Sequence, residues 1–181
     1  ELRRVTDYER HPTADLAILW SAPDGTDERR SSDHAFAELP QDLDEVRKGD
    51  EFRAMGFPVE GPAASAQEPV PRLFVGHFQR FFTFDGLSGR KFFAGEMSIP
   101  APAGLSGGPL WVPENPSKLI AIVSSNMESY SIIDSYEEAT QDGEVTRGEI
   151  RRQISYGVCV MLSEVVDWVW DRVNSGGPLG P

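Results

Sequence analysis

A serine surrounded by small residues is the feature of this sequence best suited to covalent chemistry. Ser106 lies in the segment Gly-Leu-Ser-Gly-Gly-Pro-Leu, residues 104–110. Glycine has no Cβ and reaches positive φ easily, so the backbone can turn sharply here and approach a bound carbonyl group closely. We therefore expect the N–H groups of Gly104 and Ser106 to form an oxyanion hole beside a serine nucleophile.

An acidic residue far upstream complements this serine. Asp15 stands at the start of the apolar run Leu-Ala-Ile-Leu, residues 16–19. A carboxylate at such a strand end can hold the imidazole of a general base in one tautomer and stabilise it once it is protonated. Ser106 and Asp15 are therefore the two candidate catalytic residues of the chain.

Three segments together resemble the trypsin/chymotrypsin-like serine peptidases, in particular their bacterial and HtrA-type members. They are residues 11–19 (His-Pro-Thr-Ala-Asp-Leu-Ala-Ile-Leu), residues 49–58 (Gly-Asp-Glu-Phe-Arg-Ala-Met-Gly-Phe-Pro) and the serine motif. The resemblance implies a double six-stranded antiparallel β-barrel with a C-terminal helix, the first barrel being incomplete in this chain. It also implies an acyl-enzyme mechanism, a protein or peptide substrate, no metal and no cofactor.

The general-base histidine of that family is missing from the expected place. In the family it precedes the aspartate, usually in the segment Thr-Ala-Ala-His, whereas only fourteen residues precede Asp15 here. We interpret the chain as the later part of a peptidase domain, with the base on a missing N-terminal segment. Two alternatives stay open: a catalytically inactive protein-binding module, and a separately cleaved N-terminal chain that reassociates. His11, His34 and His77 are interpreted as surface or strand histidines.

The residues around the serine motif predict the primary specificity pocket. Family members that cleave after basic residues carry an aspartate six positions before the serine, and this chain has Pro100 there. A pocket without that carboxylate favours small or apolar substrate residues. Leu105 replaces the aspartate with which animal members bind a newly freed N-terminus, which argues against that activation route. The expected pocket residues are Ile99, Pro100, Ala101, Ala103, Ser124, Ser125 and Asn126.

Short apolar runs separated by Gly, Pro and Asp clusters predict an all-β protein. The expected strands are 16–20, 49–58, 73–84, 91–99, 119–125 and 154–160, and a helix capped by Ser163 is expected over 163–173. Residues 130–152 are long and acidic without a clear period, which predicts a surface loop. The expected domains are the remainder of the first barrel (1–60), an inter-barrel connector (61–72), the second barrel with its helix (73–174) and a flexible tail (175–181).

Composition limits the partners and the location. With 29 acidic and 17 basic residues, the formal charge of −12 makes nucleic acid and anionic membranes poor partners. The single cysteine, Cys159, allows no intrachain disulfide, which predicts a bacterial cytoplasmic protein. The acids between residues 134 and 149 lack the spacing of a calcium loop, so no metal is expected. The remaining expected partners are the missing N-terminal segment and further domains of the parent protein.

Overall fold

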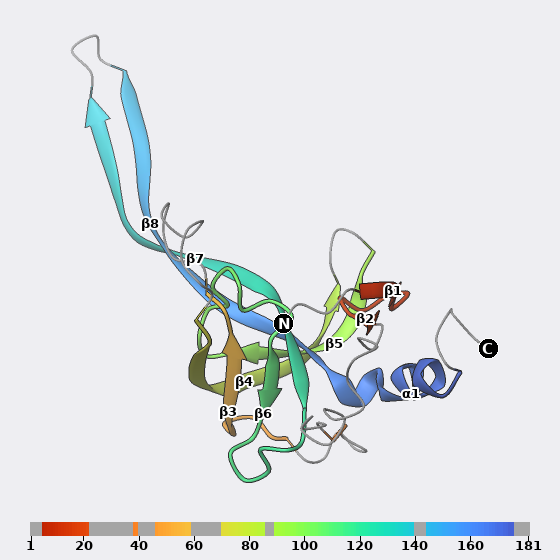
Figure 1. Cartoon of the computed structure of the whole chain (residues 1–181). Coiled ribbons are helices and arrows are strands. Elements are labelled where there is room, and N and C mark those ends of the chain that lie inside the picture. Colours follow the sequence, from red (N-terminus) through yellow and green to blue (C-terminus); the bar gives the residue numbers. More distant parts are fainter. Residues whose placement is uncertain are drawn as a thin grey trace.

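The computed structural model describes residues 5–21, 38–39, 46–58, 70–85, 89–139 and 144–175. Its central element is a closed antiparallel barrel with the strand order β3-β4-β5-β8-β7-β6, which confirms the predicted all-β class. The strands of the barrel are β3 (Glu51–Gly56), β4 (Arg72–Asp85), β5 (Lys91–Met97), β6 (Pro109–Trp111), β7 (Ala121–Ala139) and β8 (Val145–Met161). Each of the six expected strands overlaps an observed one. Figure 1 shows β7 and β8 running far beyond the barrel.

The barrel closes around an aromatic and aliphatic interior. On β3, Phe52 and Ala54 alternate with more exposed neighbours and are completely buried, as the two-residue period of a half-buried strand requires. Phe52 packs against Phe78 of β4 with 5.0 Å between the ring centroids. Burying a side chain of this size stabilises a fold by about 1.5–3 kcal/mol. The interior cluster also contains Met97, Leu110, Ile120, Ala121, Val123, Cys159 and Met161.

A separate two-stranded sheet packs on the outside of the barrel. It consists of β1 (Val5–Arg10) and β2 (Ala17–Ser21), which pair antiparallel. The turn between them contributes Ala14 to a second hydrophobic cluster, against which Leu16 also packs. That cluster further contains Phe92, Ala94, Val158, Val160, Leu162 and Val165. The part of the outer barrel face formed by β5 and β8 is therefore buried beneath the segment that carries Asp15.

The C-terminal helix continues this packing. A 3-10 helix (Leu162–Glu164) leads into α1 (Val166–Asn174), so the predicted helix is present but starts later than expected. Ser163 was expected to cap it; the residue at the cap is Val165, and the buried Ser163 hydroxyl has no hydrogen-bond partner among the described residues. Arg172 binds Glu9 of β1 at 2.7 Å, which ties α1 to the small sheet. No helix in the described ranges is both long and apolar enough to cross a membrane.

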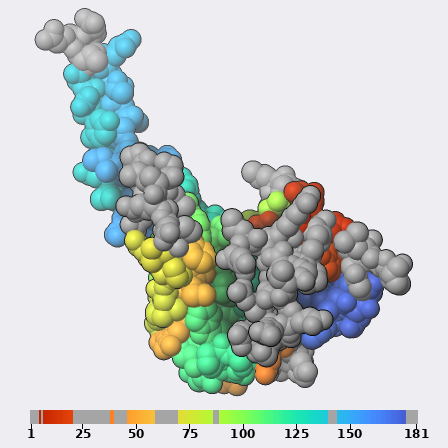
Figure 2. Space-filling model, viewed as in Figure 1, coloured from red at the N-terminus to blue at the C-terminus, as the bar shows by residue number. Residues whose placement is uncertain are grey.

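The loop prediction for residues 130–152 is wrong. Residues 130–139 and 145–152 belong to a β-hairpin in which β7 and β8 stay paired from Ala121↔Met161 to Ala139↔Val145. The outer part of this hairpin, residues 127–139 and 144–156, is named the arm below. Figures 1 and 2 show it as a narrow projection that leaves the barrel on one side.

One predicted domain boundary is also displaced. The segment 1–60 was assigned to the first barrel, but β3 lies within that range and pairs with both β4 and β6. The observed barrel therefore starts at Glu51 rather than at residue 73. Most of the expected connector (61–72) and nearly all of the expected tail (175–181) lie outside the described residues.

Candidate active site

The serine motif forms a tight loop between β5 and β6, and a buried leucine anchors it. Leu105 is fully buried in the barrel interior, whereas its neighbour Ser106 is exposed. The Leu105 N–H donates to the Pro102 carbonyl, and the Gly108 N–H donates to the Leu105 carbonyl at 2.8 Å. A side chain on Gly56 would meet Leu105 Cδ1 at 2.8 Å, so that glycine leaves the space that Leu105 occupies. Leu105 therefore anchors the loop in the barrel interior, and Ser106 faces solvent.

Gly104 has the backbone conformation that the sequence analysis expected. Its φ is +90°, in the region that favours glycine, and a Cβ there would overlap the Phe57 carbonyl oxygen. The Gly104 carbonyl accepts the Phe57 N–H at 3.0 Å, which holds the loop against the end of β3. Within the described residues, the N–H groups of Gly104 and Ser106 donate to no protein group. Both therefore remain available to a bound oxygen.

Strand β7 holds the C-terminal side of the same loop. The Gly107 N–H donates to the Val123 carbonyl at 2.8 Å, and the Val123 N–H donates to the Gly108 carbonyl at 2.9 Å. Gly107 has a φ of +83°, so the chain turns back immediately after Ser106. These two hydrogen bonds attach the loop of Ser106 to Val123 of β7.

Asp15 is fixed to the next residue of that strand. The Ser124 hydroxyl donates to Asp15 Oδ2 at 2.7 Å, joining residues 109 positions apart. Arg90, at the start of β5, forms an ion pair with Asp15 Oδ1 at 2.6 Å. Consecutive residues of β7, Val123 and Ser124, therefore hold the serine loop and the aspartate. The sequence analysis assigned Ser124 to the substrate pocket and gave Arg90 no role.

A histidine builds the turn that presents Asp15. His11 Nδ1 accepts the backbone N–H groups of Thr13 at 3.2 Å and Ala14 at 2.9 Å. The ring also packs edge-on against Trp168 of α1, with 4.9 Å between centroids. Partial burial lowers the pKa of His11 below its ordinary value of 6.5. His11 is thus a neutral acceptor within the turn.

No contact in the described part of the chain joins the His77 side chain to Ser106 or Asp15. His77 lies on β4, and its backbone N–H donates to Ser98 Oγ at 2.8 Å. His34 lies outside the described residues. Cys159 is completely buried, which raises the pKa of its thiol to about 12 and leaves it protonated.

Two walls of the expected specificity pocket are joined by Asn126. Its amide oxygen accepts the Ala101 N–H at 2.6 Å, and its amide nitrogen donates to the Ala101 carbonyl at 2.8 Å. The Ile99 carbonyl accepts the Gly157 N–H of β8 at 2.8 Å. Ala101 is buried, whereas Ala103 beside Gly104 is exposed. A signal for this contact is absent from the sequence, because residues 101 and 126 are distant in the chain.

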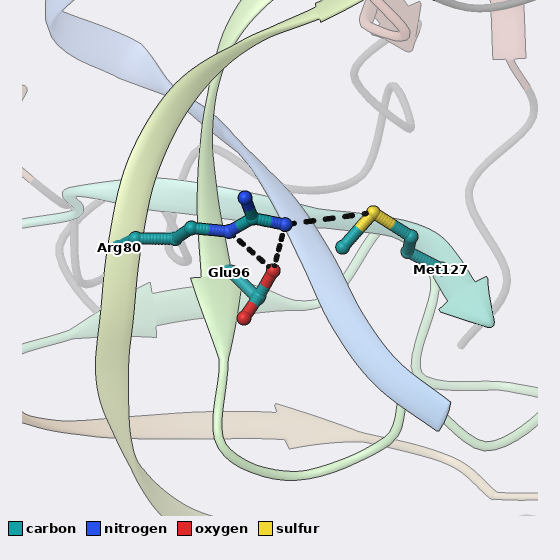
Figure 3. Close-up of polar contacts among 3 residues, drawn as sticks. All are labelled: Arg80, Glu96 and Met127. Carbon is teal, nitrogen blue, oxygen red and sulfur yellow. Dashed lines mark hydrogen bonds and ion pairs between the residues drawn. The ribbon is translucent and has the colours of Figure 1, made fainter. Parts of the chain in front are cut away.

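An ion pair between a buried glutamate and a half-exposed arginine lies where the arm leaves the barrel. Glu96 of β5 is only 6% exposed, and its Oε2 accepts Arg80 Nε of β4 at 2.7 Å. Figure 3 shows the Arg80 guanidinium between Glu96 and Met127, whose sulfur lies 4.0 Å from Arg80 Nη2. The guanidinium also lies over the Phe82 ring, 4.8 Å from its centroid. This cluster connects the barrel wall to the first arm residue of β7.

No family model matches the chain, and no curated protein matches it significantly. In the described part of the chain, no three His, Cys, Asp or Glu side chains are arranged to hold a metal ion.

Proposed function

We propose that the protein is a serine endopeptidase of the trypsin-like class and that the observed barrel is the second of its two barrels. The observation that carries this proposal is the pair of adjacent attachments on β7. Val123 bonds the loop of Ser106, and Ser124 bonds Asp15. The Val123 contact continues the β6–β7 ladder and the Ser124 contact links the small sheet to the barrel, so the segments of both expected catalytic residues are attached to one strand.

The proposed reaction is acyl transfer through Ser106. The hydroxyl oxygen attacks the scissile carbonyl carbon while an imidazole takes the hydroxyl proton, and the same imidazole returns a proton to the leaving amine. Water then releases the acyl group by the reverse sequence. The N–H groups of Gly104 and Ser106 stabilise the oxyanion, each by about 3 kcal/mol.

The imidazole comes from a histidine upstream of this chain. A cavity of about 440 Å³ beside Asp15, lined by residues 10–17 and Arg90, offers space for such a side chain. Each carboxylate oxygen has two lone pairs, so Asp15 can accept an imidazole N–H while it keeps Ser124 and Arg90. Ser106 is exposed, which supports the same arrangement, because the imidazole of an upstream segment can then reach the serine hydroxyl.

The substrate residue before the scissile bond is small. Asn126 bridges to both polar groups of the Ala101 backbone, so its side chain occupies the space between the two expected pocket walls. Pro100 brings no charge to the pocket floor, in agreement with small or apolar residues at this position.

Hydrolysis of a peptide library by the N-terminally extended protein tests this function. We expect cleavage after Gly or Ala, identified by mass spectrometry of the products. Ser106→Ala should lower kcat by at least about 10³-fold, and Asp15→Asn by about 10⁴-fold. Asp50→Asn is the matched control, because the Asp50 carboxylate accepts the Arg47 N–H in a turn and an asparagine oxygen can do the same.

The inactive binding module is the alternative outcome. The Arg90–Asp15 ion pair favours it, because Asp15 is already neutralised without an imidazole. A folded, extended protein that cleaves no member of the library would support this second function and contradict the first.

A further inference from the structure

Among the described residues, the arm has two unpaired sheet edges, and the edge of β7 leads directly to the candidate active site. In the barrel, β7 pairs with β8 on one side and with β6 and the serine loop on the other. Beyond Val123, no described strand pairs with that second side. The arm residues of β7 extend this edge by about 40 Å at 3.3 Å per residue.

A free edge of this length is a template for another strand. Half of its N–H and C=O groups point away from β8 and can pair with an extended chain. Proline and lysine, two of the residues that protect such edges, do not occur between residues 121 and 160. Several large apolar side chains of the arm are also exposed: Tyr130, Ile132, Ile133, Tyr136, Val145 and Ile150.

The contacts at the base of the arm favour the β7 edge over the β8 edge. β8 is covered by β5 from Gly157 to Val160, so its free edge starts on the far side of β5 from the serine loop. β7 becomes free at Ser124, directly after the residue that bonds Gly107. A strand antiparallel to β7 would run from the tip of the arm towards Ser106.

The acidic charge of the arm part of β7 favours a basic segment at this edge. The arm part of β7 carries four acidic residues and no basic one, whereas all three arm arginines are on β8. One of the acids, Glu137, is paired with Arg147 at 2.7 Å. Opposite charges on facing strands are favourable, and like charges directly opposite are unfavourable. The β7 edge of a second copy would place acids against acids, whereas a basic strand would be attracted. The four acids are Glu128, Asp134, Glu137 and Glu138.

The arm part of β7 carries acidic and apolar side chains on both of its faces. A bulge between Ile132 and Asp134 changes the face, so Tyr130 and Ile132 lie on one side while Asp134 and Tyr136 lie on the other. Tyr136 covers Gly148, and a Cβ on that glycine would overlap its ring. Each face therefore offers acidic and apolar positions within one strand.

We propose that the edge of β7 in the arm binds an extended, lysine- or arginine-rich segment of the polypeptide substrate, N-terminal to the bond that is cleaved. This inference rests on the proposed function, because the antiparallel direction is what brings the segment to Ser106. The segment adds as a further strand, with its basic side chains opposite the acids of β7 and its apolar side chains against Tyr130, Ile132 and Tyr136.

Peptide binding to the protein carrying Ser106→Ala tests the inference without catalysis. The probe is a fluorescent twelve-residue peptide that repeats Lys-Lys-Val-Val, compared with Glu-Glu-Val-Val and with a Lys peptide N-methylated at alternate residues. We expect the Lys peptide to bind at least about tenfold more tightly than the Glu peptide, and more weakly as salt rises. The N-methylated peptide should not bind, because it cannot form the ladder.

Two variants of the arm locate the binding edge. Replacing residues 129–154 by Asn-Gly joins the observed pair Glu128↔Ser155 with a two-residue hairpin turn and should abolish binding. Asp134→Lys/Glu138→Lys should weaken binding by about tenfold. Glu144→Lys/Glu149→Lys makes the same charge change on β8 and should have less than about a threefold effect. Circular dichroism of each variant establishes that it folds.

The outcomes separate the inference from the proposed function. Arm-dependent binding by a protein that hydrolyses no peptide would overturn the function and keep the docking edge. Equal binding of the Lys and Glu peptides, or an equal loss of Lys-peptide binding in the two double-lysine variants, would contradict the proposed docking edge. Neither result would affect the proposed peptidase function. Dimers that disappear when the arm is shortened would assign the edge to a second copy of the chain, and this also contradicts the inference.

Discussion

Gly104 is the residue at which backbone conformation and the proposed chemistry coincide most closely. Its φ of +90° and its contact with the Phe57 carbonyl both exclude a side chain. Its N–H is one of the two donors proposed for the oxyanion. A substitution here therefore changes the donor geometry while it leaves the nucleophile in place.

We expect Gly104→Ala to lower kcat for peptide hydrolysis by about 10²–10³-fold, the usual cost of losing one oxyanion donor. Gly49→Ala is the matched control, because Gly49 has a φ of +94° and open space around it. Both variants strain the backbone, so thermal unfolding should shift in both. Only the Gly104 variant should lose activity, and activity within threefold of wild type would contradict its role.

Single residues were predictable where their type and neighbours determine the chemistry. Ser106 and Gly104 could be singled out because a glycine-flanked serine has few other uses, and the positive φ at Gly104 agrees with that argument. Arg90 and Asn126 could not, since each acts through a partner that is distant in sequence. The two backbone contacts of His11 gave no signal in the sequence.

Elements were predictable where one face is buried. β3 and β5 alternate or concentrate apolar residues because they line the barrel, and their positions were expected correctly. The strands of the arm could not be predicted in this way. Both faces of the arm are exposed to solvent, so its polar and apolar residues follow no period of two. Its bulge between Ile132 and Asp134 disturbs any remaining alternation.

The His11 turn gives a prediction at the scale of the elements that it joins. The pKa of His11 is lowered from 6.5 in the folded protein, so the unfolded chain binds a proton more readily below that pH. The contribution of the turn to stability is therefore complete above about pH 6.5 and decreases as pH falls through the lowered folded value. Chemical unfolding followed by Trp fluorescence should show this decrease.

His11→Asn is the control for this pH effect. An asparagine oxygen can accept the same turn N–H groups but does not titrate, so this part of the pH dependence should disappear. Stability that falls equally with pH in the variant and in wild type would show that the decrease has another source.

At the scale of the whole molecule, β7 connects every part of the proposed function. It closes the barrel, bonds the serine loop at Val123, bonds Asp15 at Ser124, and continues into the arm. The small sheet, which carries Asp15, is held to the barrel by Arg90 and by the Lys91 N–H, which donates to the Thr13 carbonyl at 3.0 Å. The loop of Ser106 and the side chain of Asp15 are therefore both attached to β7.

The most direct test of this arrangement is reaction with a fluorophosphonate, which forms a covalent bond to an activated serine. The N-terminally extended protein is labelled, digested and analysed by mass spectrometry, beside Ser106→Ala and the exposed-arm control Ser131→Ala. We expect the label on the peptide containing Ser106, its loss in Ser106→Ala and its retention in Ser131→Ala. A folded extended protein with no label at Ser106, or with undiminished labelling of Ser106→Ala, would contradict the assignment of Ser106 as the nucleophile.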